Sequence, residues 1–368
     1  MTYSYFQSSG DARDYLESLA NCEVVALDTE FIRTRTFYPI PALYQLNAGG
    51  DIALIDATDK GDWSAFIGVL QSETQVKAMH ACGEDLEVFS RHFALKPVNL
   101  FDTQVANAFV SDVFSISYAR LVNNLLGVEL DKHETRSDWL QRPLGENQLE
   151  YASDDVYYLL DLYHELRNKL ISLGRLEWFM EEMQRLLNPS VITPENFFRS
   201  VKRSNNLSPQ GLSKLQALCL WRENQARLDD VPRGRVVKDE QLVAIAALAD
   251  PDSTEIVRTL DFRTNRKYGK SIVDAFEAGR SVPVDQYPEP AEAPLTKKQG
   301  DLVKQLKQFA TTRAVELNMA PELLGRKRDI EATIRRFLKS GILADVHTGW
   351  RMDIVGEEFL NIMKRTLQ

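Results

Sequence analysis

The sequence is poor in cysteine and has no long apolar run. Its three cysteines, Cys22, Cys82 and Cys219, lie far apart among 368 residues and form no Cys-x-x-Cys pair. That distribution argues against a disulfide scaffold or a thiolate zinc site, and it is typical of a reducing cytoplasm. No stretch approaches the ~20 apolar residues of a membrane span. The first residues also lack the basic start and apolar core of a signal peptide. We therefore expect a cytoplasmic protein with no membrane contact.

Basic residues are scarce in the first half of the chain. Residues 1–194 hold 15 Lys and Arg against 29 Asp and Glu, residues 195–285 hold 15 against 13, and residues 291–368 hold 14 against 10. An acidic N-terminal half and a mildly basic C-terminal half are expected if the first binds cations and the second approaches phosphates. Chance asymmetry on solvated surfaces produces the same numbers, so charge alone does not favour a nucleic-acid enzyme.

Short β-branched runs alternate with helical patterns in the first half. Apolar spacing predicts helices over 63–70 and 86–93 and a long helix over about 144–170. The sequence Asn47-Ala48-Gly49-Gly50 predicts a hairpin between two of the strands. Antiparallel strands followed by strand–helix alternation predict a mixed sheet flanked by helices. The predicted strands are Val24–Leu27, Ala42–Leu46, Ile52–Ile55, Val76–Met79 and Asn99–Phe101.

We predict no strand beyond residue 195. Two helical segments flank a Pro-rich stretch, VPVDQYPEPAEAP at 282–294, whose composition indicates an exposed linker. Apolar positions and one proline recur in both segments at offsets of 88 or 89, as in Leu218 and Leu306 or Pro232 and Pro321. The repeat favours a duplicated helical module over two unrelated bundles. A chain of this length is also too long for one ordinary core.

Asp28 and Glu30 directly follow the apolar run Val24 to Leu27. Side chains alternate along a strand, so these two carboxylates point to the same face. They repel each other unless a positive charge lies between them, and a hard divalent cation with oxygen ligands is the simplest partner. An exposed, solvated strand end explains the tripeptide Asp28-Thr29-Glu30 equally well.

Two further acids accompany this pair. Asp85 begins a predicted helix, where the helix dipole favours an acid in any case. Tyr151 and Asp155 are four residues apart, so both lie on one face of the long helix. A phenol and a carboxylate in that arrangement can hold a water and a metal, respectively. An amphipathic helix with a half-buried tyrosine and a solvated aspartate beside its apolar face gives the same pattern.

The joint order of these acids resembles the DEDD exonucleases with a tyrosine in their last motif, and in particular the ribonuclease D family. The similarity is carried by four blocks in the family's order: VALDTEFIRTRTFYP, HACGEDLEVF, FDTQVANAF and TRSDWLQRPLGENQLEYASDDVYYLL. The segment LWRENQARLDDVPRGRVVKDEQLVAIA resembles the C-terminal module that this family shares with helicases, known as HRDC. A second copy, in which Phe309 replaces Trp221, follows at 297–368.

The resemblance implies a fold, a domain organisation and a set of active-site residues. The fold would be an α/β ribonuclease-H-like exonuclease domain over 1–194, followed by two small all-α HRDC-type domains. These would span 207–281 and 297–368, with a Pro-rich linker at 282–296 between them. Catalysis would rest on Asp28, Glu30, Asp85, Tyr151 and Asp155.

The resemblance also implies two divalent ions, Mg²⁺ or Mn²⁺. Asp28 would bridge both ions, Glu30 and Asp155 would complete the shell of the one that carries the attacking water, and Asp85 would act through water on the other. Tyr151 would orient the attacking water. An all-carboxylate site suits these hard ions better than zinc. The implied activity is 3′→5′ hydrolysis of RNA, in particular at the 3′ ends of tRNA precursors, by a monomer without an obligate protein partner.

Six further residues are candidates for contact with RNA. Phe31, Tyr38 and Gln45 lie near the acidic strand, but they suit packing equally well. Arg263, Arg266 and Lys267 interleave with Tyr268, a pattern of cations and an aromatic side chain that also occurs on solvated helix ends. Two alternative functions stay open: a DNA 3′→5′ exonuclease, since the same acids serve both polymers, and a non-catalytic RNA-binding scaffold.

Overall fold

The computed structural model describes residues 2–130, 137–189, 193–289 and 294–367, and its contacts divide the chain into two units. The first unit comprises Met1–Ile32, Ile40–Pro189 and Leu295–Gln368, and the second comprises Arg33–Pro39 and Ser190–Pro294. None of the helices among these described residues is both long and apolar enough to span a membrane.

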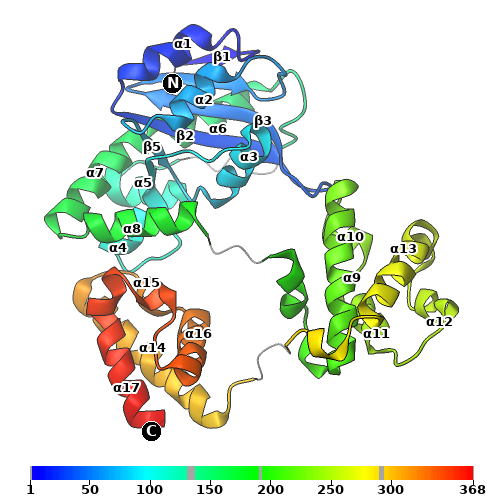
Figure 1. Cartoon of the computed structure of the whole chain (residues 1–368). Helices are drawn as coiled ribbons and strands as arrows, with labels where there is room; N and C mark the ends of the chain where they lie inside the picture. The colour runs from blue at the N-terminus through cyan, green and yellow to red at the C-terminus, as the bar shows by residue number, and fades with distance from the viewer. Residues whose placement is uncertain (1, 131–136, 190–192, 290–293, 368) are drawn as a thin grey trace. The chain divides into compact units, whose positions relative to one another are not determined.

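The first unit is built on a sheet flanked by helices (Figure 1). The sheet is mixed, with the strand order β1-β4-β3-β2-β5-β6. Strands β4, β3 and β2 are antiparallel neighbours, whereas β1 pairs with β4, β5 with β2, and β6 with β5 in parallel. The predicted mixed sheet and hairpin are confirmed. The strand bounds are β1 Tyr3–Phe6, β2 Val24–Ile32, β3 Ile40–Ala48, β4 Asp51–Asp56, β5 Val76–Met79 and β6 Leu100–Asp102.

Strand β1 was not predicted, and β2 and β3 are longer than their apolar runs. β1 is a four-residue edge strand that pairs only with β4, so its existence depends on a tertiary contact rather than on its own pattern. β2 extends through its acids to Ile32, and its register against β3 shifts after Glu30. This irregularity is a β-bulge at the acidic end of the strand.

Helices cover both faces of the sheet, as predicted. Val25 and Leu27 pack under α1, α2 and α3, whereas Ala26 packs on the opposite face under α6. Asp28 and Glu30 continue the face of Ala26 because side chains alternate along β2. The helices of this part are α1 Arg13–Ser18, α2 Ser64–Gln71, α3 Gly83–Phe93, α4 Thr103–Val110, α5 Tyr118–Leu126, α6 Glu146–Tyr157, α7 Leu159–Ser172 and α8 Leu176–Leu187.

The long helix predicted over 144–170 is two helices. α6 ends at Tyr157, and α7 begins at Leu159. The apolar stripe runs through both helices, because Ala152 and Val156 pack on the sheet and Leu162 and Leu166 pack on the next core. Periodicity therefore could not reveal the break, which is produced by a side chain from another helix.

Helices of residues 295–368 complete the first unit. Trp350 stacks on Trp178 of α8, with ring centroids 5.3 Å apart. Arg351 donates to both carboxylate oxygens of Glu182, at 2.5 and 2.8 Å. Such paired charge-assisted bonds fix orientation as well as adding stability. The helices are α14 Lys297–Leu317, α15 Pro321–Gly325, α16 Lys327–Ser340 and α17 Glu357–Leu367.

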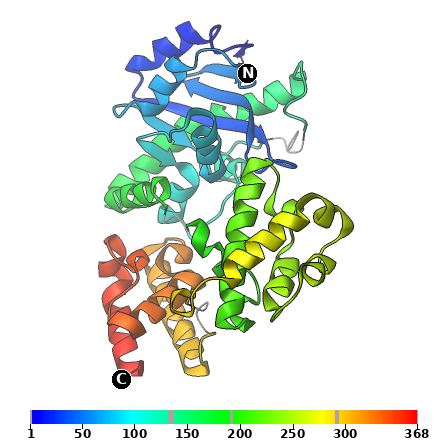
Figure 2. The same ribbon diagram turned by 45° about the vertical axis from the view of Figure 1, so that its right-hand side comes forward.

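The second unit is helical, and α9 and α13 form its central pair (Figure 2). Their close approach requires Gly279, because a Cβ there would lie 2.6 Å from the Cα of Lys214. No strand occurs among residues 193–289 or 294–367, as predicted. Residues 290–293 of the predicted linker lie outside the described residues. The helices are α9 Pro209–Leu228, α10 Arg233–Val236, α11 Asp239–Ala247, α12 Ser253–Arg258 and α13 Phe262–Arg280.

The segment Arg33–Pro39, which joins β2 to β3 in the sequence, packs in the second unit. Phe37 is buried in the core of that unit. The carboxylate of Asp230 accepts hydrogen bonds from the backbone amides of Phe37 at 3.0 Å and Tyr38 at 3.1 Å. The loop therefore has a defined conformation within the helical unit.

Candidate active site

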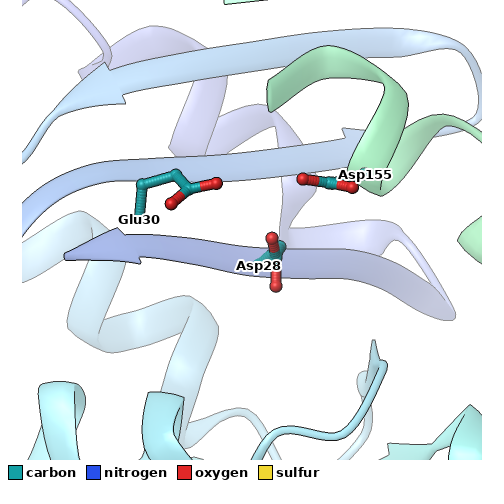
Figure 3. Close-up of side chains that lie close together, drawn as sticks. All are labelled: Asp28, Glu30 and Asp155. Carbon is teal, nitrogen blue, oxygen red and sulfur yellow. The ribbon is translucent and has the colours of Figure 1, made fainter. Parts of the chain in front are cut away.

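Three carboxylates from two elements meet at the end of β2. One carboxylate oxygen from each of Asp28, Glu30 and Asp155 can be chosen so that all three lie within 4.8 Å of one another. Figure 3 shows the carboxylates of Glu30 and Asp155 pointing toward each other, with Asp28 beside them on its strand. All three residues are half-buried, so the cluster keeps a path to solvent.

Asp155 and Tyr151 are presented by α6. Gly145 precedes the helix, and its amide donates to the side chain of Gln148 at 3.0 Å, which caps the first turn. Ala152 and Val156 then anchor the helix on the sheet face that Asp28 and Glu30 share. The spacing of four therefore places Tyr151 and Asp155 together on the side of α6 next to the acids of β2.

Asp85 reaches the same strand from the other side. It lies in the first turn of α3 and is 7% exposed, and the hydroxyl of Thr29 donates a hydrogen bond to it. Thr29 lies between Asp28 and Glu30 and points to the opposite face. Asp85 is not one of the three acids that gather most tightly, although its charge raises the pKa of Asp28 more than any other neighbour does.

Burial and mutual repulsion raise the pKa of every acid in the site. The pKa of Glu30 rises to about 9 because it is buried beside Asp155 and Asp85. Burial raises the pKa of Asp155 to about 7 and that of Asp85 to about 6, with hydrogen bonds from Tyr151 and Thr29 opposing part of the rise. The pKa of Asp28 lies well above its usual range because the residue is buried among the other three acids.

This electrostatic pattern fits a divalent cation. The neighbours that shift the pKa values of these four acids include no basic side chain from the described residues, so those residues do not compensate the negative charge of the ionised cluster. A cation would supply that compensation, and an all-oxygen donor set is the one that Mg²⁺ and Mn²⁺ prefer. The residues present therefore fit divalent ions held by Asp28, Glu30, Asp85 and Asp155.

The candidate RNA-contact residues lie in different environments. Phe31 is half-buried against the core under α1 to α3, and Tyr38 packs in the second unit. Gln45 is fully buried directly opposite Asp28 in the β2–β3 ladder, and neither polar atom of its side chain has a partner among the described residues. Arg263 and Arg266 are exposed at the start of α13.

Lys267 and Tyr268 of α13 are engaged within the second unit. Both donate to the carboxylate of Asp229, at 2.8 Å from the amine and 2.5 Å from the phenol. Tyr268 is 7% exposed, so its ring is not free to stack on a base. The exposed aromatic side chain of this helix is Phe262, which is 79% exposed and was not among the predicted RNA-contact residues.

Comparison with known protein families defines the class. Residues 3–171 match the family model of 3′-5′ exonucleases, and residues 212–275 match that of the HRDC domain. The first match covers the whole mixed sheet, so the fold is that of a 3′→5′ exonuclease, and the four acids lie within the matched residues.

Individual relatives then define the family. The chain is 38% identical to ribonuclease D of Pseudomonas paraeruginosa over 92% of both chains, and 32% identical to that of Escherichia coli over 99% of both. The crystal structure of E. coli ribonuclease D, an exoribonuclease involved in structured RNA processing, superposes with a TM-score of 0.92 over 99% of both chains. The chain belongs to the ribonuclease D family of 3′→5′ exoribonucleases. This membership confirms the predicted fold and activity.

Proposed function

We propose that this exoribonuclease trims the 3′ ends of tRNA precursors and releases nucleoside 5′-monophosphates with the help of two divalent ions, Mg²⁺ or Mn²⁺. The observation that carries the proposal is the convergence of Asp28, Glu30 and Asp155 within 4.8 Å, with Asp85 beside them. We assign Asp28, Glu30, Asp85 and Asp155 as metal ligands, and these four with Tyr151 as the catalytic residues. The enzyme would act as a monomer in the cytoplasm.

The roles of the side chains follow from their chemistry. Bound divalent ions lower the pKa of a water and neutralise charge on the phosphate and on the leaving 3′ oxygen. The four carboxylates would hold these ions, and they are presented by β2, α3 and α6. Burial and the neighbouring acids raise the pKa of Tyr151, so its hydroxyl keeps its proton. That proton is donated to Asp155, so Tyr151 would orient the attacking water by accepting a hydrogen bond from it at the phenol oxygen.

Digestion of matched substrates tests the proposed function. We expect the enzyme with Mg²⁺ to shorten a tRNA precursor with a 3′ extension one nucleotide at a time and to release 5′-monophosphates. A DNA strand of the extension sequence should be degraded at least ~10-fold more slowly if the site binds the 2′-hydroxyl, the group that distinguishes RNA. Faster digestion of DNA would favour the DNA exonuclease, and RNA binding without turnover would favour the scaffold.

Domain bounds belong to the same proposal. We assign the exonuclease domain to 1–194, the two HRDC-type domains to 207–281 and 297–368, and the linker to 282–296. The first HRDC-type domain would supply basic contacts to the RNA backbone, since Phe262, Arg263 and Arg266 are exposed together at the start of α13. An exposed aromatic ring next to cations suits a single strand, because the ring can stack on a base while the cations contact phosphates.

Removal of this basic patch should weaken RNA binding and leave the chemistry intact. The double variant Arg263→Ala/Arg266→Ala is expected to raise KM for precursor tRNA several-fold. It should also lower the salt slope of binding by about 1 for each phosphate that the two arginines would neutralise. The control Lys297→Ala/Lys298→Ala removes the same charge from α14. Equal effects of both pairs on the salt slope would contradict a specific role for α13.

A further inference from the structure

The break between α6 and α7 is produced by the side chain of Tyr118. In an uninterrupted helix the amide of Tyr158 would donate to the carbonyl of Asp154. Instead the Tyr118 hydroxyl stands between the two groups. It donates to the Asp154 carbonyl at 3.0 Å and accepts from the Tyr158 amide at 3.2 Å. A side chain inserted into the helical ladder opens a turn and bends the helix axis.

Asp155 lies inside the opened turn. The carbonyl of the preceding residue, Asp154, accepts a hydrogen bond from Tyr118. The carbonyls of the two following residues, Val156 and Tyr157, each accept one from the side-chain amide of Asn47 at 3.1 Å. Three carbonyls around Asp155 are therefore held by side chains from α5 and β3. The direction of its carboxylate depends on these tertiary contacts as well as on the helix.

Tyr118 is itself held in place near the sheet. The carbonyl of Ile116, two residues earlier, accepts from His80 at 3.1 Å and from the side chain of Gln104 at 2.8 Å. The ring of His80 lies 5.6 Å from that of Tyr118, edge to face. Because His80 directly follows β5, this chain of contacts ties the phenol to the strand next to β2.

We propose that Tyr118 is a positioning residue for the hydrolytic reaction: its inserted hydroxyl holds the α6–α7 turn at the angle at which Asp155 meets Asp28 and Glu30. This inference rests on the proposed function. Tyr118 acts through the backbone around Asp155 and not on the reacting atoms. Without the hydroxyl, nothing separates the Tyr158 amide, which also donates to the Val156 carbonyl, from the Asp154 carbonyl. The turn would then relax around the Val156 bond or close into the direct helical bond. Each change turns Asp155 away from the other two acids.

The test compares Tyr118→Phe with the matched control Tyr158→Phe. The control removes a neighbouring phenol hydroxyl that makes no hydrogen bond with the described residues, and it keeps the backbone amide that Tyr118 binds. For Tyr118→Phe we expect Mn²⁺ affinity without RNA, measured by calorimetry, to fall roughly 10-fold or more. We expect kcat to fall about 10- to 100-fold while KM for RNA stays within about twofold. Exchange of the Tyr158 amide hydrogen should change, and the control should match wild type.

Each outcome bears on a separate claim. If wild type neither binds Mn²⁺ nor degrades RNA, the proposed function fails. If wild type does both and Tyr118→Phe keeps its Mn²⁺ affinity and kcat within about twofold, the positioning role is wrong while the proposed function stands. Thermal unfolding of both variants separates a local effect from a general loss of stability, because a general loss would lower the unfolding temperature without a selective change in metal affinity.

Discussion

Asp28→Asn and Asp155→Ala are each expected to reduce the release of nucleotides from an RNA 3′ end by about a thousand-fold or more. Each substitution removes a carboxylate that would hold a divalent ion. Such ions stabilise the transition state by several kcal/mol, and each ~1.4 kcal/mol of lost stabilisation lowers the rate tenfold. The measurement is single-turnover release of 5′-monophosphates from a 3′-extended precursor tRNA at saturating Mg²⁺.

The Asp28→Asn variant should also be more stable than wild type in the absence of cations. Asp28 is half-buried beside three other acids, so replacing its carboxyl with an uncharged amide removes the cost of repulsion in the folded state. We expect its unfolding temperature in chelator to rise by about 2 °C or more, since ~1 kcal/mol corresponds to a few degrees in a chain of this size. The control is Asp161→Asn, an exposed acid on α7. Full activity in Asp28→Asn or Asp155→Ala would end the assignment of the site.

Removal of divalent ions should abolish activity, and their return should both restore it and stabilise the fold. A ligand that binds only the folded state stabilises it by about 2.7 kcal/mol at a hundred times its Kd. Thermal unfolding in a series of Mn²⁺ concentrations measures this effect. Asp28→Asn, with one ligand fewer, should show a smaller shift. Activity that persists in excess chelator, or an unfolding temperature unmoved by Mn²⁺, would contradict a metal site at these acids.

The stability of the cation-free protein should depend on pH in a defined direction. The folded-state pKa values of Asp85, Asp155 and Glu30 are raised to about 6, 7 and 9. A group whose folded pKa exceeds its unfolded value binds more protons when folded, so stability falls as the pH rises above the unfolded pKa and levels off above the folded one. We expect the unfolding temperature in chelator to fall between about pH 5 and 9, and saturating Mn²⁺ to remove most of that fall.

Local sequence rules predicted part of the candidate site. Alternation along a strand predicts that Asp28 and Glu30 share a face, and a spacing of four predicts the same for Tyr151 and Asp155. Both rules describe neighbours within one element, and neither says that the two elements face each other. The order of the motifs along the chain supplied that link through family resemblance. The roles of Thr29 and Tyr118 could not be predicted, because their partners are 56 and 36 residues away.

Local pattern by itself determined five of the six strands, the hairpin, the helices over 63–70 and 86–93, and the helical character of the residues after 195, because periodicity and turn residues depend on neighbours in sequence. Only the tertiary structure decided the edge strand β1, the division of one periodic helix into α6 and α7, and the packing of the C-terminal helices against α8. These features arise from contacts between distant residues, and a period of 3.6 continues unchanged through a turn that another helix opens. The cluster of acids belongs to the same class, since its raised pKa values exist only where the chain brings four carboxylates together.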